Sequence, residues 1–216
     1  MIRLYDYILS AEGYKVRLLM SMLGLTYEPV KVDVHPGRMH RDPAFLAINP
    51  LGTLPVLEDG EVCLRDAQAI LVYLAARHDA SRAWLPAGPE DAGRVAMWLA
   101  FAGHEMAPLL RLRMADIQAA PVPGRDGVEA ASRHALGLLE DHVFEGELHG
   151  RRWLVGDRPT IADVAVFPGV ALMADCGLPV EDYPALWRWV HAFKRLPGFI
   201  VMPGILPPDL ADALAA

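Results

Sequence analysis

A helix N-terminus that could bind an anion is the first feature of chemical interest in the sequence. Asp66 can cap a helix whose buried face would consist of Ala67, Ile70, Leu71 and Leu74. The first backbone N–H groups of a helix lack partners within it, and together with the helix dipole they favour a carboxylate. Asp66 and Ala67 therefore mark a place that could hold a charged ligand, unless Asp66 serves only as the helix cap.

The cysteines and histidines form no pattern typical of redox or metal chemistry. Cys63 and Cys176 lie far apart and no CxxC pair occurs, which disfavours a disulfide framework and fits a reducing compartment. His104 and Glu105 are adjacent instead of at ligand spacing, and there is no HExxH motif. We expect no metal site, and we expect Cys63 to be a packing residue of a strand.

Composition places the chain among globular proteins. Of its 216 residues 53% are apolar and 22% are charged, which suits one large core or two modest ones. The net charge is −7 and no basic block occurs, so nothing supports nucleic-acid binding. The sequence shows no signal-peptide pattern and no apolar run of the ~18 residues that span a bilayer. We expect a cytoplasmic protein that does not bind membranes.

The elements that would position Asp66 alternate between strands and helices. Residues 2–5 and 30–34 show the period-2 pattern of strands, and Val16, Leu19, Met20 and Leu23 share one face of a helix between them. Further elements are expected as a short helix over 45–48, strands over 54–57 and 62–64 joined by Asp59-Gly60, and the helix after Asp66. This order predicts an α/β, thioredoxin-like domain over residues 1–80 with a parallel βαβ crossover.

The rest of the chain reads as helical. Residues 79–91 are rich in Pro, Gly and charge and are expected to form a linker. Helical spacing then runs from Val95 through Met106 to Leu109, Thr160 and Asp163 form a capping box, and a last helix is expected over 184–195. We predict an all-α helical bundle over 88–216, with a fraying Ala-rich tail after Pro207.

Four segments resemble motifs of the glutathione transferase family, in order and over nearly the whole chain. Residues 49–57 (NPLGTLPVL) resemble its NPxGxxPVL stretch, and residues 66–74 (DAQAILVYL) resemble ESxAIxxYL. Residues 156–163 (GDRPTIAD) resemble the G…xTxAD motif that starts a helix of the second domain. Leu4-Tyr5, Ser10 and residues 14–19 (YKVRLL) match the first strand and helix of the family.

The resemblance implies a glutathione site on the α/β half. A cis bond before Pro55 would turn the backbone of Leu54 toward the peptide, which could pair with it like an extra strand, with Thr53 nearby. A trans bond at an edge-strand proline is the alternative. His40 would bind the glycyl carboxylate, with Arg41 as the alternative.

Asp66 and Ala67 take the place of the family's Glu-Ser pair. The resemblance implies that Asp66 holds the γ-glutamyl amino group and that the N–H of Ala67 holds the γ-glutamyl carboxylate. Asp is one methylene shorter than Glu, and Ala lacks the hydroxyl. A lost hydrogen bond to a charged group is worth about 1.5–3 kcal/mol, so weaker glutathione binding is expected.

Ser10 is the candidate catalytic hydroxyl. It follows Tyr5 by five residues, which is similar to the LYxxxxS of theta-type transferases, although its loop is one residue longer. A hydroxyl aimed at sulfur stabilises the thiolate, which is the nucleophile and which forms with a pKa of about 8.5 when unperturbed. Tyr5, Tyr7 and Tyr14 are rival hydroxyls, and the absence of a dedicated hydroxyl is a third possibility.

The function implied is conjugation of glutathione, as co-substrate, to small apolar electrophiles by a homodimer. The electrophile pocket would be lined by Met106, Leu110, Arg111 and Met114, unless these residues are only bundle core. A glutathione-dependent disulfide or peroxide reductase is a second hypothesis. A non-catalytic protein that binds ligands or partners is a third, and Ala67 is the residue that favours it.

Overall fold

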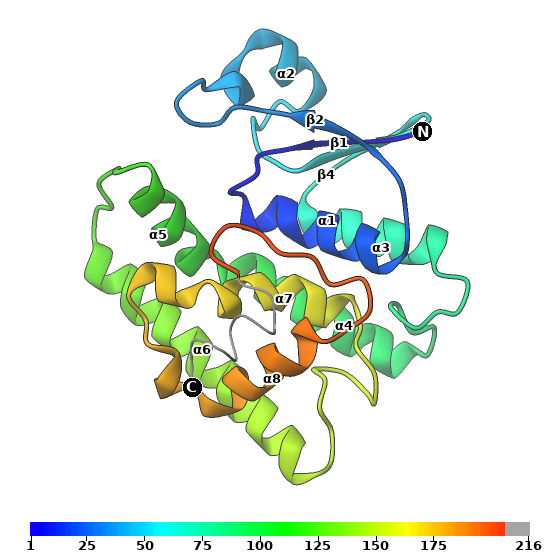
Figure 1. Ribbon diagram of the computed structural model, residues 1–216, viewed down its shortest axis with the longest axis vertical. Helices are drawn as coiled ribbons and strands as arrows, with labels where there is room; N and C mark the ends of the chain where they lie inside the picture. The colour runs from blue at the N-terminus through cyan, green and yellow to red at the C-terminus, as the bar shows by residue number, and fades with distance from the viewer. Residues whose placement is uncertain (206–216) are drawn as a thin grey trace.

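The first half of the chain is a four-stranded sheet with helices on both sides (Figure 1). The computed structural model describes residues 1–205. Its first elements are β1 (Ile2–Asp6), α1 (Ala11–Met22), β2 (Glu28–Lys31), η1 (Met39–Arg41), α2 (Pro43–Ile48), β3 (Val56–Asp59), β4 (Val62–Arg65) and α3 (Ala67–His78). The strand order is β2-β1-β3-β4, with β1 and β2 parallel and the other neighbours antiparallel. The predicted element order is present.

Three expectations for the first half need correction, and the first is the strand expected over 54–57, which lies at Val56–Asp59. The strand expected over 30–34 lies at Glu28–Lys31, because its partner β1 ends at Asp6, which pairs with Lys31. Only one further bond follows, from Val32 N to Asp6 O at 2.9 Å. The expectation that Cys63 is a packing residue is wrong, because its side chain is exposed on the outer strand β4.

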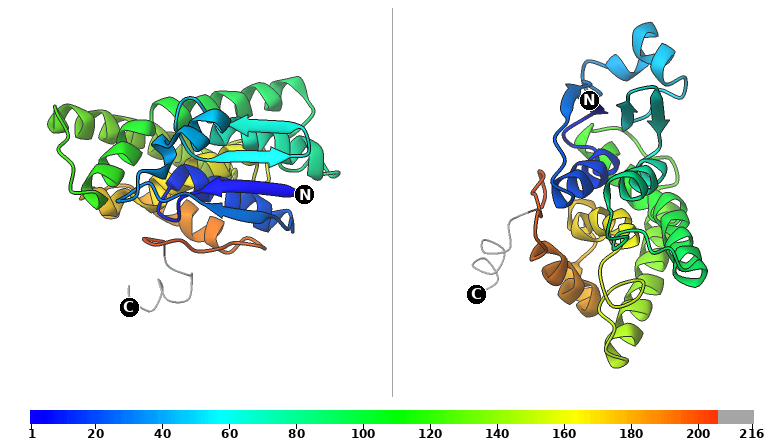
Figure 2. Two further views of the ribbon diagram at one scale, coloured as in Figure 1. Left: turned by 90° about the horizontal axis from the view of Figure 1, so that it is seen from above. Right: turned by 90° about the vertical axis from the view of Figure 1, so that its right-hand side faces the viewer.

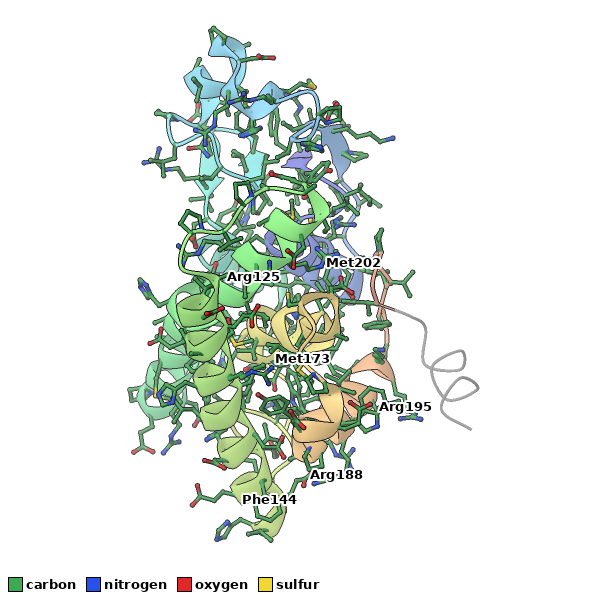
Figure 3. The ribbon with its side chains drawn as sticks, turned by 90° about the vertical axis from the view of Figure 1, so that its left-hand side faces the viewer. Arg125, Phe144, Met173, Arg188, Arg195 and Met202 are labelled. Carbon is green, nitrogen blue, oxygen red and sulfur yellow. The ribbon has the colours of Figure 1, made fainter. Side chains whose placement is uncertain are left out.

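The regular elements of the second half are helices, and an isolated antiparallel bridge joins Met202 and Ile205 near the end of the described residues. The helices are α4 (Pro89–His104), α5 (Ala107–Ile117), α6 (Arg125–Leu148), α7 (Ile161–Ala171), η2 (Met173–Cys176), η3 (Val180–Asp182) and α8 (Pro184–Lys194). Figure 3 shows the long α6 from Arg125 to Phe144 and, beside it, Arg188 of α8, which donates to Glu147 at 3.0 Å. The capping box at α7 is present, with Thr160 N donating to Asp163 Oδ2 at 2.8 Å. The Ala-rich tail after Pro207 lies outside the described residues.

One helix expected from Val95 through Met106 to Leu109 is two helices. The helix is interrupted at Glu105 and Met106, which lie between the end of α4 and the start of α5. Pro108 occupies the first turn of α5, where its missing N–H costs nothing, whereas inside a helix its ring would clash with the carbonyl four residues earlier. The break lets α5 take its own direction toward the sheet (Figure 1).

The two halves share one apolar core. Helix α7 lies at its centre, and all its residues from Ile161 to Val170 are buried. It packs against α4 and α8 on one side and against α1 and α3 of the first half on the other. The right-hand view of Figure 2 shows α1 and α3 stacked on these helices. No helix among residues 1–205 is long and apolar enough to cross a membrane.

Candidate glutathione site

Ser10 caps helix α1 at the end of a short loop that follows β1. Its Oγ accepts a hydrogen bond from Gly13 N at 3.1 Å, and its own N–H donates to Tyr7 O at 2.8 Å. Because Oγ accepts from the backbone, its own proton stays available for a ligand. The N-terminus of α1 adds a partial positive charge beside the hydroxyl. This arrangement favours an anion next to Ser10.

Glycine at position 13 is required by a close approach. A Cβ there would lie 1.6 Å from Asp6 Oδ1, so the carboxylate packs directly on the glycine backbone. Arg17 holds the same carboxylate, with Nε 2.8 Å from Asp6 Oδ2, and its Nη2 donates to Ile8 O at 3.1 Å. Asp6, Gly13 and Arg17 thereby fix the loop that presents Ser10. These contacts were not predicted from the sequence. The glycine in the first turn of α1 is the feature that could have indicated a close approach there.

A cavity of about 600 Å³ opens beside Ser10, and we call it the Ser10 cavity. It lies between the sheet's loops and α5. Its lining includes seven of the predicted site residues: Ser10, His40, Thr53, Leu54, Leu110, Arg111 and Met114. Tyr7, Ala11, Glu12, Val34, Arg41, Gly52, Ala107 and Gln118 complete the lining. Residues predicted from separate motifs thus surround one space.

The wall formed by Thr53 and Leu54 is held by Asn49. The fully buried Asn49 side chain donates from Nδ2 to Thr53 O at 2.8 Å and to Thr53 Oγ1 at 3.0 Å. The Leu54–Pro55 bond is cis, as predicted, and Pro55 is buried behind the wall. A second cis bond, His35–Pro36, was not anticipated from the sequence. The role of Asn49 was also missed, although it begins the NPLG motif.

Asp66 and Ala67 start helix α3 as predicted, but they do not line the Ser10 cavity. Asp66 Oδ1 accepts from Ala69 N at 3.1 Å and therefore caps the helix. Its φ of +83° is rare for a residue with a side chain, and it turns the chain sharply between β4 and α3. Asp66 is exposed, whereas Ala67 is 2% exposed. Asp66 is thus the helix cap, with its carboxylate open to solvent.

Met106 lies away from the cavity. It is 1% exposed and packs against α7, where a Cβ on Gly169 would lie 2.5 Å from its methyl carbon. The break before α5 turns Met106 into the bundle, while Leu110 and Met114 line the cavity one and two turns later. The structure therefore separates Met106 from the other three residues expected around the electrophile.

The three tyrosine hydroxyls that are alternatives to Ser10 differ in their hydrogen-bond partners. Tyr5 donates to Glu58 Oε2 at 3.0 Å, and Tyr14 donates to Ile200 O at 2.6 Å inside the protein. Burial raises the pKa of both phenols, most strongly for Tyr14. Only Tyr7 lines the Ser10 cavity, and its hydroxyl lies 3.5 Å from His35 O. Ser10 and Tyr7 are therefore the two candidates that a ligand in the cavity could meet.

The cavity carries an excess of positive and proton-donating groups. Arg41 and Arg111 line it, and burial and the nearby Arg41 and Arg38 lower the pKa of His40, so that its imidazole is neutral at pH 7. His40 Nδ1 is buried without a hydrogen-bond partner among residues 1–205. The lining carboxylate, Glu12, accepts from Lys15 Nζ at 2.7 Å. Such a surface suits an anionic ligand.

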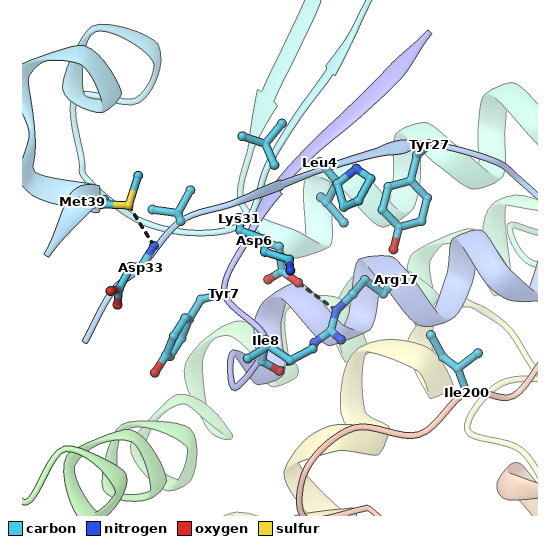
Figure 4. A pocket seen from close by; sticks show the side chains of 13 residues that line it. Leu4, Asp6, Tyr7, Ile8, Arg17, Tyr27, Lys31, Asp33, Met39 and Ile200 are labelled. Atoms are coloured by element: carbon cyan, nitrogen blue, oxygen red, sulfur yellow. Dashed lines mark hydrogen bonds and ion pairs between the residues drawn. The ribbon is translucent and has the colours of Figure 1, made fainter. Parts of the chain in front are cut away.

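A second cavity of about 690 Å³ lies on the other side of Tyr7, between α1 and β2 (Figure 4). Its walls are largely apolar, with Leu4, Tyr27, Met39 and Ile200 among them. The Asp6–Arg17 pair lies at its base, and burial raises the pKa of Asp6 to about 6 despite the Arg17 charge. Nowhere in residues 1–205 do three or more His, Cys, Asp or Glu side chains group as metal ligands.

Comparison with known proteins agrees with this architecture. Residues 4–82 match the family model "Glutathione S-transferase, N-terminal domain", and residues 113–197 match "Glutathione S-transferase, C-terminal domain". The chain is 30% identical to glutathione S-transferase 3 of Zea mays over 204 residues, covering 92% of this chain and 91% of the relative. It is 35% identical to a maleylacetoacetate isomerase of Rhizobium meliloti over 177 residues, covering 77% and 79%.

A solved structure shows the same fold. A glutathione transferase homologue from Lodderomyces elongisporus, described with two GSH per subunit, superposes with a TM-score of 0.83 at 27% identity, covering 91% of this chain and 94% of that one. The match extends over both halves, the sheet with its helices and the helical bundle. By sequence, family models and fold, the chain belongs to the glutathione transferase family of enzymes.

Proposed function

We propose that the chain binds glutathione in the Ser10 cavity and joins its sulfur to the electrophilic carbon of a small substrate with an apolar body. The observation that carries this proposal is the Ser10 hydroxyl, which accepts from Gly13 N at 3.1 Å and lines the cavity with its proton free. The hydroxyl can therefore donate a hydrogen bond to a thiolate sulfur. This bond stabilises the thiolate and lowers the pKa of the bound thiol.

We assign one group of the chain to each part of glutathione. Leu54 offers its backbone beside the cysteinyl unit, and His40 with Arg41 suits the glycyl carboxylate. The start of α3, with the N–H of Ala67 and the exposed Asp66 carboxylate, suits the γ-glutamyl end. The homologue from L. elongisporus, described with GSH bound, supports this peptide as the ligand.

The reaction needs little beyond a stabilised thiolate. The thiol proton leaves to solvent, and the sulfur attacks the electrophilic carbon. A sulfur–carbon bond forms while the bond to a leaving group such as halide breaks, and the leaving group takes the electron pair. Leu110 and Met114 offer apolar surface for the carbon skeleton of that substrate.

Calorimetric titration with glutathione, followed by the rate with 1-chloro-2,4-dinitrobenzene, tests the proposal. We expect heat of binding and a rate above the uncatalysed one. The absence of both heat and a thermal shift at millimolar glutathione would refute it. Binding without any turnover would instead favour a non-catalytic, ligand-binding member of the family.

Reduction of disulfides is a second candidate, which the two GSH per subunit of the L. elongisporus homologue favour. Two glutathione thiols would be oxidised to one disulfide while the substrate disulfide is reduced to two thiols. Hydroxyethyl disulfide compared with chlorodinitrobenzene separates the candidates. Turnover of the disulfide alone would support reduction over conjugation.

We also propose a cytoplasmic homodimer. Val72 of α3 and Met97 of α4 are 38% and 55% exposed on two helices that pack side by side, which leaves apolar surface for a second copy. Sedimentation velocity of the wild type and of a Met97→Glu variant tests this. A monomeric wild type at micromolar concentration would exclude the dimer.

A further inference from the structure

We propose that Arg111 selects second substrates that carry a carboxylate next to their apolar body. The inference rests on the proposed function, because it concerns the other reactant in the Ser10 cavity. Arg111 lies on α5 between Leu110 and Met114 in the lining of that cavity. Its position puts a guanidinium beside the apolar surface that would hold the electrophile.

Arg111 has no side-chain partner in the part of the chain that the structure describes. Its guanidinium makes no hydrogen bond or ion pair with any of residues 1–205, and the residue is exposed. Arg113, two residues later on the same helix, is 2% exposed and uses its three nitrogens on Asp175 (2.8 Å), Leu9 O (2.7 Å) and Pro203 O (3.1 Å). Arg113 is thus a structural residue, whereas Arg111 keeps all its donors for a ligand.

The carboxylates of α5 and of the cavity lining have other partners. Asp116, the carboxylate of α5 itself, accepts from Arg125 Nη1 at 2.6 Å and from Nη2 at 2.8 Å. Glu12, the carboxylate of the cavity lining, accepts from Lys15 at 2.7 Å. The positive charge of Arg111 is therefore not neutralised by either of them.

The two carboxylates of glutathione have other binding groups in the proposed site. The glycyl carboxylate is assigned to His40 and Arg41 on the opposite wall, and the γ-glutamyl carboxylate to the start of α3, outside the cavity lining. Arg111 is left for the second substrate. A planar guanidinium binds a carboxylate through two parallel hydrogen bonds, which makes it selective for that group over a neutral one.

A matched pair of electrophiles tests the inference. 1-Chloro-2,4-dinitrobenzene and 4-chloro-3,5-dinitrobenzoate lose chloride by the same displacement, but only the second carries a carboxylate. We expect Arg111→Gln to lower kcat/KM for the benzoate roughly 10- to 100-fold and to change that for the neutral compound less than about threefold. Arg111→Lys should recover part of the loss. Arg94→Gln, which removes an exposed arginine paired with Asp91 on α4, should change neither rate.

Two results would overturn the inference. An equal loss with both electrophiles would mean that Arg111 acts on the thiolate or on the fold. A weaker calorimetric affinity for glutathione in Arg111→Gln would mean that Arg111 binds glutathione itself.

A binding experiment separates failure of this inference from failure of the proposed function. The unreactive 3,5-dinitrobenzoate and 1,3-dinitrobenzene are titrated into the wild type and Arg111→Gln without glutathione. Tighter binding of the benzoate to the wild type, lost in the variant, supports Arg111 even if no turnover occurs. Equal binding of both compounds to both proteins overturns it, whether or not glutathione binds.

Discussion

Arg113 Nη1 of helix α5 donates to the carbonyl oxygen of Leu9 at 2.7 Å, one residue before Ser10. The bond joins the helical half to the loop that presents the candidate catalytic hydroxyl. Arg113 is almost completely buried, and its Nε lies 2.8 Å from Asp175 Oδ2. A side chain from the helical half of the chain therefore helps to fix the position of Ser10 relative to α5, which carries the proposed electrophile surface.

Replacing Arg113 by Met should destabilise the protein and impair catalysis together. Removing one partner of a buried pair leaves unsatisfied groups and costs roughly 3–5 kcal/mol, reduced here because Asp175 is partly exposed. Thermal unfolding and kcat report the two effects. Arg111→Met, two residues away on the same helix, is the control and should leave stability within about 0.5 kcal/mol. Equal stability of the two variants would contradict the role given to Arg113.

Ser10→Ala should raise the pKa of bound glutathione toward the free thiol value of about 8.5 and lower the conjugation rate at pH 7. Thiolate absorbance in the ultraviolet, followed against pH in the complex, measures the shift. Because Ser10 also caps α1, the Ala variant should lose about 1 kcal/mol of stability.

Two further variants separate these effects at Ser10. Ser10→Gly largely keeps the cap and removes the hydroxyl, so it should be stable and slow. Ser10→Thr keeps both the cap and the hydroxyl and should remain active. A fully active Gly variant would transfer the proposed role to Tyr7.

Gly13→Ala should disturb the loop before α1. Its Cβ would overlap Asp6 Oδ1, and overpacking of this kind costs about 1–3 kcal/mol. Asp6→Ala combined with Gly13→Ala should cost less than the sum of the two single changes, which a double-mutant cycle in denaturant measures. Gly137→Ala in α6 has open space around it and is the matched control, expected to stabilise by about 0.4–1 kcal/mol.

The pH dependence of stability should carry the signature of Asp6. Burial raises its pKa to about 6, so the folded protein binds this proton more tightly than the unfolded chain does. The contribution of Asp6 to the unfolding free energy therefore falls as pH rises from about 4 to about 6, by at most about 3 kcal/mol.

Urea unfolding of the wild type and Asp6→Asn at several pH values measures this slope. Asp163, whose pKa burial also raises to about 6, contributes equally to both proteins and cancels in the difference. A wild-type-minus-variant difference that stays flat from pH 4 to pH 6 would rule out the raised pKa.

Ala67→Ser tests the placement of the γ-glutamyl end. The added hydroxyl at the start of α3 could donate to the γ-glutamyl carboxylate, and such a bond is worth about 1.5–3 kcal/mol. Glutathione affinity should therefore rise roughly tenfold or more, as measured by calorimetry. Ala69→Ser, at an exposed position two residues further along the helix, is the control and should leave glutathione affinity unchanged. Unchanged affinity in both variants would place that end of the peptide elsewhere.

Local signals allowed most of the fold to be predicted. The capping box of Thr160 and Asp163, the Asp-Gly hairpin and the cap of Asp66 each depend on neighbours a few residues away. The motif segments also placed Ser10, His40 and Leu54 around one cavity, because the family resemblance carries information on distant contacts.

Other features depend on packing that periodicity does not encode. Met106 and Met114 share a helical pattern, but the break before Pro108 sends them to the core and to the cavity respectively. Arg111 and Arg113 are two residues apart in sequence, and the contacts with Leu9, Asp175 and Pro203 distinguish the buried Arg113 from the exposed Arg111. The Asp6–Arg17 pair could likewise not be predicted from the sequence, because it depends on how α1 packs beside the end of β1.

The continuous core around α7 limits how this protein can be divided. Helices α1 and α3 bury their apolar faces on α7, so a fragment ending near residue 80 would expose them to water. The composition change near residue 80 therefore does not separate two independently folding units. We expect the chain to unfold in a single transition. Exchange of the helical half with that of a relative would keep this core packed only if the α1 and α3 residues that face α7 were exchanged together with it.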